Sequence, residues 1–321
     1  MKKMLVAVAL LSASLTMCCA EALYLHILKA DGQWELFDLS SVNKLTFKNG
    51  GMQLLCAGDE TELRDDAEMP IVVEGWIENG AYPMVIITRA IDLTKPMDSL
   101  DNYVEKWCRV SISDGTSRYY MTARINKNYI PSFVYTTTKL RGQVDKEYEL
   151  MIETETDTFT ATTRIIQPLR IDSVRVRASQ NDASLYQVSA FANIDNTMPG
   201  SSYKFFSKIV GAELRYYSSF LGTFESVAYD PTTGFNVAKG IHNTFEGEQK
   251  FSPLYNYGDT VDVKLCTISR EQFDFWNAYE NSVSLSGQSF FNVARGCPSN
   301  IDGALGYWFG YGVSAVRVII K

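Results

Sequence analysis

The sequence predicts an all-β protein with two strand-rich domains, and three observations carry this prediction. Short runs of β-branched and apolar residues alternate with turn residues along most of the chain. Only one segment has apolar residues at helical spacing. The chain of 321 residues is 46% hydrophobic and 21% charged, which is globular composition. A chain of this length can bury one large core or two medium ones.

The N-terminus has the organisation of a secretory signal peptide over residues 1–20. Lys2 and Lys3 precede an apolar run over residues 4–17, which small residues then follow at Cys18, Cys19 and Ala20. The run is shorter than the ~20 residues of a spanning helix. We therefore expect export to the cell envelope, at the outer-membrane surface or in the periplasm, with no membrane-spanning segment after signal cleavage. A lipid anchor stays an alternative, although Met17 precedes Cys18 where a lipoprotein signal has a small residue.

Residues 21–69 are expected to form a short β-hairpin unit and an acidic linker. Alternating strands over 23–28 and 34–39 flank a turn at Gly32, and residues 41–47 can add a third strand. The acidic run over 59–68 lacks the residue order and central glycine of a calcium loop. A solvated linker explains it better.

Residues 70–168 are predicted to form the first domain, an immunoglobulin-like or transthyretin-like sandwich. About seven short strands in about a hundred residues, with no helical period, are typical of such folds. Asp114 and Gly115 mark one hairpin turn. The clearest strands are expected over residues 71–77, 84–88, 109–113, 117–123, 147–153 and 159–166.

Residues 169–321 are predicted to form a second β-rich domain, barrel-like or a sandwich, with one covering helix. Ser269 and Gln272 form a capping box that starts a helix over about 270–283. Its apolar face should pack against a sheet through residues at three-and-four spacing, namely Phe273, Trp276, Tyr279 and Val283. Strands are expected over 172–177, 185–192, 203–210, 222–229, 261–269 and 313–320.

Charge and residue counts exclude several function classes. A net charge of −7 argues against nucleic-acid binding. Only two histidines, His26 and His242, are present, so a histidine-cluster metal site is not expected, and no cofactor motif occurs. The motifs of common hydrolases are also absent, and we expect no catalytic residues. After signal removal four cysteines remain, without C-x-x-C spacing; their pairing stays open, with free thiols favoured (Cys56, Cys108, Cys266 and Cys297).

The most function-like patch is a run of glycines and aromatic residues over 303–312. Aromatic faces there could stack on a sugar ring or a peptide. The candidate ligand contacts are four rings from this run and from the predicted helix: Trp276, Tyr307, Trp308 and Tyr311. The alternative is that the glycines permit close strand approach and the aromatic residues fill the core beneath the helix. We favour the core interpretation.

Several stretches make the sequence resemble an uncharacterised Bacteroidetes family, the domain of unknown function 4249. The resemblance spans about residues 70–315. It is carried by Glu74-Gly75-Trp76 within residues 71–77, by residues 82–85, 110–115, 146–150 and 171–174, and by Phe275-Trp276, Asn300-Ile301 and Gly306-Tyr307-Trp308.

The resemblance implies an envelope protein, often a lipoprotein, with a sandwich followed by a second β domain and no established activity. It also implies a position beside TonB-dependent outer-membrane transporters, and it supplies no catalytic residues. One departure is that residues 22–47 lie between the signal and the acidic stretch. In typical members the lipidated cysteine comes just before that stretch, so the departure argues against a lipid anchor here.

These observations favour an exported, non-enzymatic protein with a binding or accessory role. The expected partner is an outer-membrane transporter or a surface glycan or peptide. The alternative is an adhesin or structural surface subunit, in which a sheet edge receives a strand from a neighbour. A glycan hydrolase with paired carboxylates is the third hypothesis.

Overall fold

The protein is described here from a computed structural model. The structure describes residues 69–90, 100–197, 200–240, 252–286 and 297–321, and four strands nearer the N-terminus. The chain divides into two compact units, Met1–Glu68 and Met69–Lys321. The predicted signal peptide, the acidic run, His242 and the side chains of His26, Cys56 and Val283 lie outside what is described.

The first unit contains two antiparallel hairpins. One pairs β1 (Tyr24–Leu28) with β2 (Trp34–Asp38), as the alternation predicted. The other pairs β3 (Val42–Lys48) with β4 (Gly51–Cys56). The fourth strand lies in a stretch that the sequence pattern assigned to the linker.

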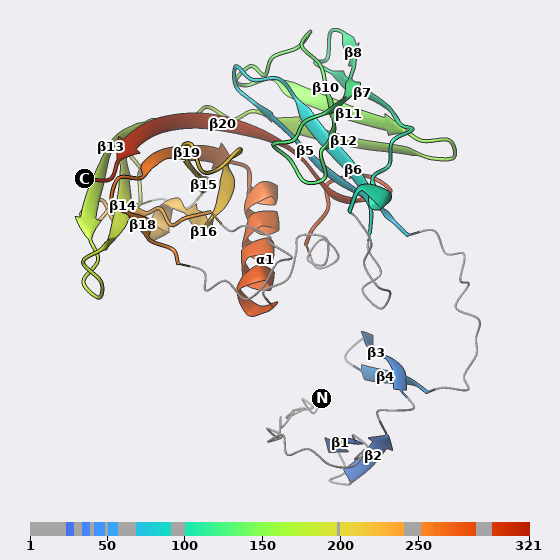
Figure 1. Cartoon of the computed structure of the whole chain (residues 1–321). Coiled ribbons are helices and arrows are strands. Elements are labelled where there is room, and N and C mark those ends of the chain that lie inside the picture. The colour runs from blue at the N-terminus through green and yellow to red at the C-terminus, as the bar shows by residue number, and fades with distance from the viewer. Residues whose placement is uncertain are drawn as a thin grey trace. The chain divides into compact units, whose positions relative to one another are not determined.

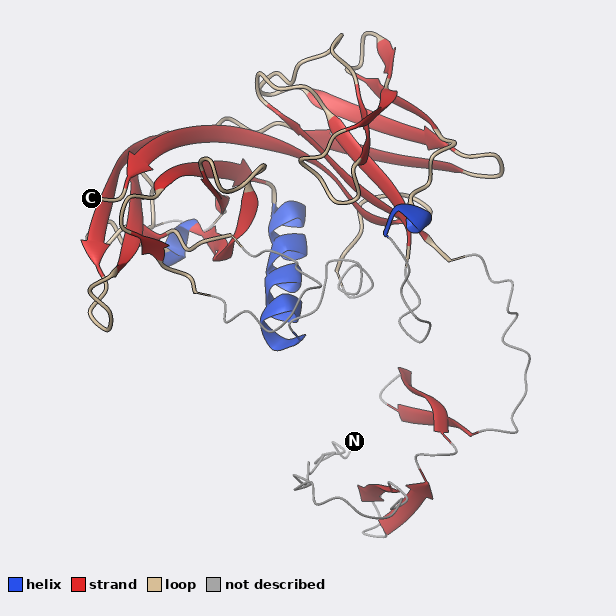
Figure 2. Ribbon diagram, viewed as in Figure 1, coloured by secondary structure: helices blue, strands red, loops and turns tan. Residues whose placement is uncertain are grey.

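The second unit confirms an all-β fold with a single α-helix among its described elements (Figure 2). Its first half contains β5 (Ile71–Glu78), β6 (Met84–Arg89), β7 (Arg109–Ser113), β8 (Arg118–Tyr120), β9 (Thr122–Ile125), β10 (Phe133–Thr136), β11 (Glu147–Glu153) and β12 (Thr158–Arg164). Its second half contains β13 (Ile171–Ala178), β14 (Leu185–Ala192), β15 (Ser202–Ile209), β16 (Tyr217–Glu225), β17 (Phe235–Asn236), β18 (Tyr255–Asn256), β19 (Thr260–Ile268), α1 (Arg270–Ser286) and β20 (Leu305–Ile319). Two short 3₁₀ helices cover Leu100–Tyr103 and Ser226–Ala228.

Two β-sandwiches share one long sheet, whose strand order is β16-β15-β19-β20-β5-β6-β10-β9. The first sandwich packs the β20-to-β9 end of this sheet against the sheet β12-β11-β7-β8. Its core is made of aliphatic and aromatic side chains that include Val73, Ile77, Val85, Ile87, Val110, Ile112, Tyr148, Leu150, Ile152 and Trp308.

The second sandwich packs the other end of the shared sheet against β13-β14-β17, with β18 also paired to β14. Its core includes Val188, Tyr203, Phe205, Phe224, Val261, Val263 and Leu265. The second β-rich domain is therefore a sandwich, which decides between the two architectures that the sequence left open.

Strand β20 belongs to both sandwiches. Residues 305–311 pair in parallel with β5, and residues 312–319 pair antiparallel with β19. Figure 1 shows this strand as one long curved ribbon that runs from one sandwich to the other. The sequence pattern placed its start at residue 313, but the strand begins eight residues earlier, at Leu305. The glycine and aromatic run is therefore part of the strand, and it completes the sheet of the first sandwich.

One side of β20 changes its packing partner along its length. Trp308 lies in the core of the first sandwich, and Val316 packs against the core of the second. Between them, Gly310 lies against the end of β12 at Arg164, and Gly312 lies against the segment that joins β12 to β13. A Cβ atom at Gly312 would lie 2.0 Å from the carbonyl oxygen of Ile166. Only glycine permits this approach of two backbones.

Side-chain amides satisfy backbone groups of β20 where strand pairing is missing. Asn300 accepts a 2.8 Å hydrogen bond from the Trp308 amide and donates a 2.9 Å bond to its carbonyl oxygen. Beyond the end of β5, Asn79 accepts a 2.5 Å hydrogen bond from the Val313 amide and donates a 3.4 Å hydrogen bond to the Val313 carbonyl oxygen. Because buried backbone groups need partners, these two residues allow the strand to continue between its two pairing regions.

Helix α1 begins with the predicted capping box. The Ser269 amide donates to Gln272 Oε1 over 3.2 Å, and the Gln272 amide donates to Ser269 Oγ over 3.3 Å. Trp276 and Tyr279 lie in a buried aromatic cluster, and Phe273 packs against it. The helix therefore covers a sheet with the expected face.

Candidate functional site

The candidate site lies on the side of β15, β19, β20 and β5 that α1 covers, which we call the junction face. Alternate residues of neighbouring strands point to the same side of a sheet, so all four strands contribute. The register places Lys204 of β15 opposite Cys266 of β19, and Tyr307 of β20 opposite Glu74 of β5. The junction face therefore collects charged and aromatic side chains from both sandwiches.

The four side chains that the sequence singled out as ligand contacts are buried. Their exposed fractions are 5% for Trp276, 4% for Tyr307, 0% for Trp308 and 3% for Tyr311. Trp276, Tyr307 and Tyr311 lie together on the junction face, whereas Trp308 lies in the core on the other side of the sheet. A stacking contact needs an accessible ring face, so this burial favours the core interpretation of the run.

Hydrogen bonds fix the polar ends of the buried aromatic side chains. Trp276 Nε1 donates to the Tyr311 hydroxyl over 2.9 Å. The Tyr307 hydroxyl donates to Glu74 Oε1 over 3.0 Å. Buried tyrosine and tryptophan side chains normally need such partners, and here the partners come from α1, β20 and β5.

One ion pair of the junction face is fully buried. Lys204 of β15 pairs with Glu280 of α1, and their side chains are 0% and 5% exposed. Glu280 also accepts hydrogen bonds from the Gly222 amide (3.1 Å) and the Thr223 hydroxyl (2.9 Å). Burial lowers the pKa of Lys204, and the Glu280 carboxylate opposes that shift. The pair ties the helix to the sheet, because each charge is stable only beside the other.

A second ion pair connects the two sandwiches. Lys264 of β19 lies 2.6 Å from Glu78 Oε1 of β5, and its Nζ lies 4.4 Å from the ring centroid of Tyr216. Burial disfavours the charge of Lys264, but the Glu78 carboxylate outweighs it and the pKa of the lysine is raised. Lys264 therefore stays charged and paired.

Three ionisable side chains of the junction face, Cys266, Tyr307 and Tyr311, are held in their protonated forms. Burial raises the pKa of the Cys266 thiol to about 12. Burial also raises the pKa of Tyr307 and Tyr311 well above the ordinary tyrosine value. All three groups are protonated at neutral pH, so none of them is an activated nucleophile or general base.

Half-buried aromatic residues and an arginine surround this buried cluster. The Trp76 and Tyr129 rings lie 5.5 Å apart. The Arg215 guanidinium lies 5.4 Å from the centroid of the Tyr129 ring and 5.1 Å from that of Tyr217. These contacts join the connection between β9 and β10 in the first sandwich to the connection between β15 and β16 in the second.

The sequence analysis did not assign a role to these surrounding residues. The alternation of β5 carried a usable signal, since Glu74, Trp76 and Glu78 share one face while Val73 and Ile77 lie in the core. Tyr129 and Arg215 carried no such signal. They lie in connecting segments, where periodicity is lost.

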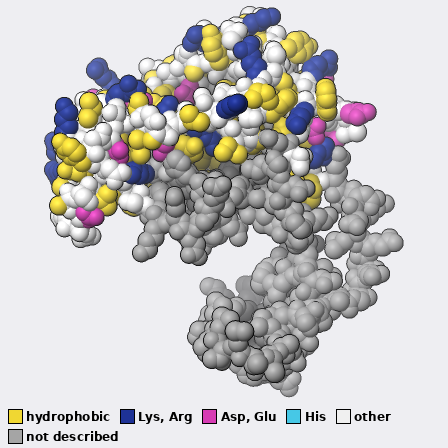
Figure 3. All heavy atoms as spheres, in the orientation of Figure 1, with side chains coloured by type: hydrophobic (Ala, Val, Ile, Leu, Met, Phe, Trp, Pro, Cys, Tyr) yellow, Lys and Arg dark blue, Asp and Glu magenta, His cyan; other side chains and the backbone are white. Residues whose placement is uncertain are grey.

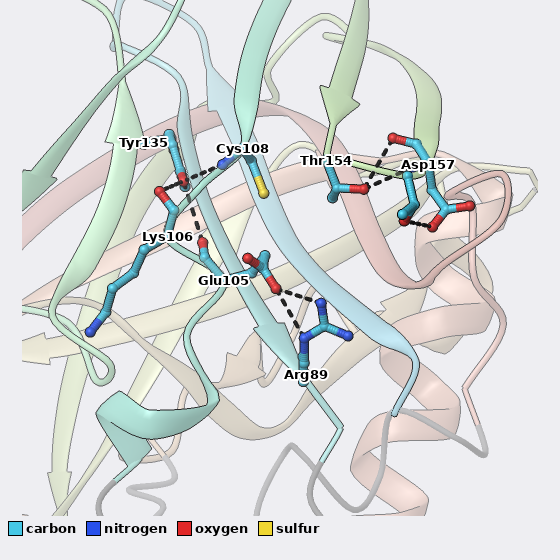
Figure 4. Close-up of polar contacts among 8 residues, drawn as sticks. Arg89, Glu105, Lys106, Cys108, Tyr135, Thr154 and Asp157 are labelled. Atoms are coloured by element: carbon cyan, nitrogen blue, oxygen red, sulfur yellow. Dashed lines mark hydrogen bonds and ion pairs between the residues drawn. The ribbon is translucent and has the colours of Figure 1, made fainter. Parts of the chain in front are cut away.

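A second candidate lies on the surface of the first sandwich. Trp107, just before β7, is 89% exposed. The backbone on both sides of it is hydrogen-bonded to the hydroxyl of Tyr135, which lies inside the sandwich (Figure 4). The sequence pattern was not used to single out Trp107. Charged neighbours just before an alternating strand were a signal for its exposure.

Metal ligands and membrane-spanning helices were considered among the residues that the structure describes. Among them, no group of three histidine, cysteine, aspartate or glutamate side chains is arranged to hold a metal ion. No described helix is both long and apolar enough to cross a membrane. Among the cysteines whose side chains are described, Cys108, Cys266 and Cys297 are free thiols.

The fold and the junction face define an all-β protein of two sandwiches joined through a shared strand. The chain belongs to the family described as Domain of unknown function (DUF4249), whose family model matches residues 60–317. No curated protein matches the chain. Among solved structures, it is similar to the crystal structure of chicken CNTN1 FN1-FN3 domains, with 8% identity and a TM-score of 0.24 over 93% of this chain and 77% of that chain.

Proposed function

We propose that this chain is an exported cell-envelope protein of a Bacteroidetes-type bacterium with a non-enzymatic binding or accessory role. The signal-like residues 1–20 and membership of the DUF4249 family support this role. The resemblance to that family implies a position beside TonB-dependent outer-membrane transporters. The partner is such a transporter, or a glycan or peptide at the cell surface.

The observation that carries the proposal is the pairing of charged groups at the junction face. Lys204 is satisfied by Glu280, and Lys264 by Glu78. Catalysis needs charged groups placed for developing charge in a substrate, whereas these groups hold α1 on the shared sheet and join the two halves of that sheet. The junction therefore produces a rigid body, and its outer surfaces keep a fixed arrangement suited to binding.

The proposal is tested with the full chain isolated from native membranes. Cross-linking and co-purification should recover an outer-membrane transporter, or glycan and peptide arrays should show a ligand. The intact mass of the same material reports whether a lipid is attached. Absence of both a ligand and a co-purifying envelope partner contradicts the proposal.

A matched pair of variants shows whether the rigid junction contributes. Arg215→Ala removes the guanidinium between Tyr129 and Tyr217 and should weaken recovery of the partner. Arg317→Ala removes a surface arginine paired only with Asp262 of its own sheet, and should leave recovery unchanged.

The alternative role, a structural surface subunit, is favoured by one edge of the shared sheet. The edge strand β9 has all four side chains exposed, and its described pairing is with β10 alone. An unpaired edge can accept a strand from another chain. This role predicts oligomers whose mass rises with concentration in analytical ultracentrifugation. Ile125→Lys, which adds a charge to the edge, should abolish them, and a strict monomer at high concentration contradicts the role.

A further inference from the structure

A single tryptophan side chain stands out on the surface of the first sandwich. Trp107 is 89% exposed, the largest value among the large hydrophobic side chains that are described as exposed. Burying a tryptophan yields more free energy than burying most other side chains. A protein that leaves one exposed forgoes that gain. Because single exposed hydrophobic side chains are common on protein surfaces, the case for binding depends on how the backbone around Trp107 is held.

The backbone around Trp107 is fixed by one buried hydroxyl group. Tyr135 of β10 is 2% exposed. Its hydroxyl donates to the carbonyl oxygen of Lys106 over 2.8 Å and lies 3.3 Å from that of Glu105. The same hydroxyl accepts a 3.3 Å bond from the amide of Cys108. Figure 4 shows these contacts converging on Tyr135 from the residues on both sides of Trp107.

Two more contacts restrain residues 105–108, which we call the Trp107 loop. Arg89 of β6 pairs with Glu105 through Nη2 at 2.7 Å and Nε at 2.9 Å. The Cys108 side chain packs against the core of the first sandwich. With its neighbours anchored inward, the indole projects into solvent from a fixed backbone. Little conformational entropy is then lost when a ligand stacks on it.

Most charges next to the Trp107 loop are paired, and the exception is the exposed Lys106, for which no ion pair is described. Arg109 pairs with Glu153 at 2.5 Å across β7 and β11. Arg118 of β8 pairs with Glu149 of β11, also at 2.5 Å. Tyr120 of β8 lies opposite Ser111 of β7 and is itself 59% exposed. The surroundings therefore offer hydrogen-bonding atoms and a second exposed ring on the neighbouring strand, with one unpaired charge, that of Lys106.

This combination decides which class of ligand fits. Phosphate and anionic lipid surfaces need clusters of unpaired basic groups, and Lys106 alone does not form one. A standard protein interface buries about 800 Å² per partner around an apolar centre. Figure 3 shows hydrophobic side chains scattered among Lys and Arg on the visible face, without one broad apolar patch. A sugar ring, by contrast, presents an uncharged C–H face to an aromatic ring and hydroxyls to paired polar groups.

We propose that Trp107 is the stacking contact of a glycan-binding surface, with Tyr120 and the Arg109–Glu153 pair beside it, and that its ligand is a neutral polysaccharide. This inference rests on the binding role proposed above and names the ligand class. The loop is preorganised by Tyr135, so the indole acts as a rigid platform for one pyranose ring.

The test uses the full chain and a panel of soluble neutral polysaccharides: β-glucan, xylan, galactomannan and starch. Native gels containing each polysaccharide show binding as slower migration, and titration calorimetry gives the Kd. At least one polysaccharide should bind. Trp107→Ala should raise that Kd by at least about tenfold, and Trp107→Phe, which keeps a smaller ring, should raise it less. Tyr135→Phe, which removes only the hydroxyl that fixes the loop, should give an intermediate loss.

The control is Tyr257→Ala, which removes another exposed ring, 69% accessible, from the turn between β18 and β19 of the second sandwich. It should bind as the wild-type chain does. Binding that persists in Trp107→Ala overturns the site while leaving the binding role intact. Failure to bind any of the four polysaccharides overturns the ligand class, and Trp107-dependent sedimentation with phosphatidylcholine vesicles overturns it in favour of a lipid surface. The binding role itself fails only through the separate co-purification and array experiments.

Discussion

The junction face and the Trp107 loop contain the same kinds of side chain, but the aromatic rings are buried in the first and the indole is exposed in the second. Both combine tryptophan, tyrosine and arginine or lysine paired with glutamate. At the junction face the aromatic rings are buried and hold α1, β20 and β5 together. In the Trp107 loop the tyrosine hydroxyl and the ion pair hold only the backbone, and the indole remains outside.

This difference shows that residue type alone does not distinguish a structural aromatic cluster from a binding one. The two kinds of cluster differ in which groups receive the hydrogen bonds: polar atoms of the aromatic side chains, or groups of the main chain. At the junction they satisfy the polar ends of the aromatic rings themselves, as Glu74 does for Tyr307. In the loop they satisfy main-chain groups, so that the ring's own surface remains free to contact a ligand.

The largest effect should come from breaking the buried pair at the junction face. Glu280→Ala leaves Lys204 charged and unpaired at 0% exposure, which should lower the free energy of unfolding by about 3–5 kcal/mol. Urea unfolding of the variant measures this loss. Replacing both partners, as Lys204→Met with Glu280→Leu, should restore most of the stability.

The control for the buried pair is an exposed one. Glu225→Ala breaks the pair with Arg270, in which the side chains are 31% and 67% exposed. Exposed pairs contribute about 0–1 kcal/mol. Equal losses for Glu280→Ala and Glu225→Ala would contradict the view that the junction depends on buried charge pairing.

The close approach at Gly312 should produce the next effect. A Cβ at this position would lie 2.0 Å from the carbonyl oxygen of Ile166, so Gly312→Ala should cost about 3 kcal/mol because two backbones must separate. Gly115→Ala is the matched control. Gly115 has a φ of +83° but no atom within 4 Å of an added Cβ, so only backbone strain of about 1 kcal/mol is expected. A similar loss of stability in both variants would show that the backbones at Gly312 and Ile166 are not in close contact.

A pH-dependent effect of smaller size is expected near the exposed side of the first sandwich. Asp114 accepts hydrogen bonds from Lys146 Nζ (2.9 Å) and from the amides of Ser117 and Thr116. The Lys146 bond and then these amides lower the pKa of Asp114 from 3.8 to about 2.

Because the folded-state pKa is depressed, the stabilisation by Asp114 is present above pH 3.8 and is lost as the pH falls towards 2. Asp114→Asn should therefore be less stable than the wild-type chain at pH 7, by on the order of 1 kcal/mol. The gap should close between about pH 4 and pH 2. Urea unfolding at several pH values measures it, and a gap that is constant with pH would rule out the ionised carboxylate as its source.

The smallest effect on stability should come from Trp107. Since the side chain is 89% exposed, Trp107→Ala should change the free energy of unfolding by less than about 0.5 kcal/mol. Thermal and urea unfolding check this expectation. A loss comparable with that of Glu280→Ala would mean that the indole is a structural group, and the contrast between the two regions would disappear.

Much of the fold was predictable because it depends on neighbours along the chain. The alternation in β5 and β11, the turn at Asp114, and the capping box at Ser269 are local patterns, and the structure contains each of them. The candidate site was less predictable. The interpretation that the aromatic residues of 303–312 fill a core beneath the helix fits Tyr307 and Tyr311, but Trp308 of the same run lies in the core on the other side of the sheet. The pairing of Lys204 with Glu280 joins residues far apart in the sequence, which no local pattern indicates.

By itself, the sequence determined the all-β class and the position of the single helix, because alternation, turn residues and capping act over a few residues. Whether the second β-rich domain is a barrel or a sandwich was decided only by the tertiary structure. Only the tertiary structure decided that β20 serves both sandwiches, that Gly312 lies against Ile166, and that Trp107 is exposed while Trp308 is buried. The physical reason is that burial depends on which distant segments cover a side chain. Trp308 is buried because the sheet of β7 and β11 covers it, whereas no described segment covers Trp107.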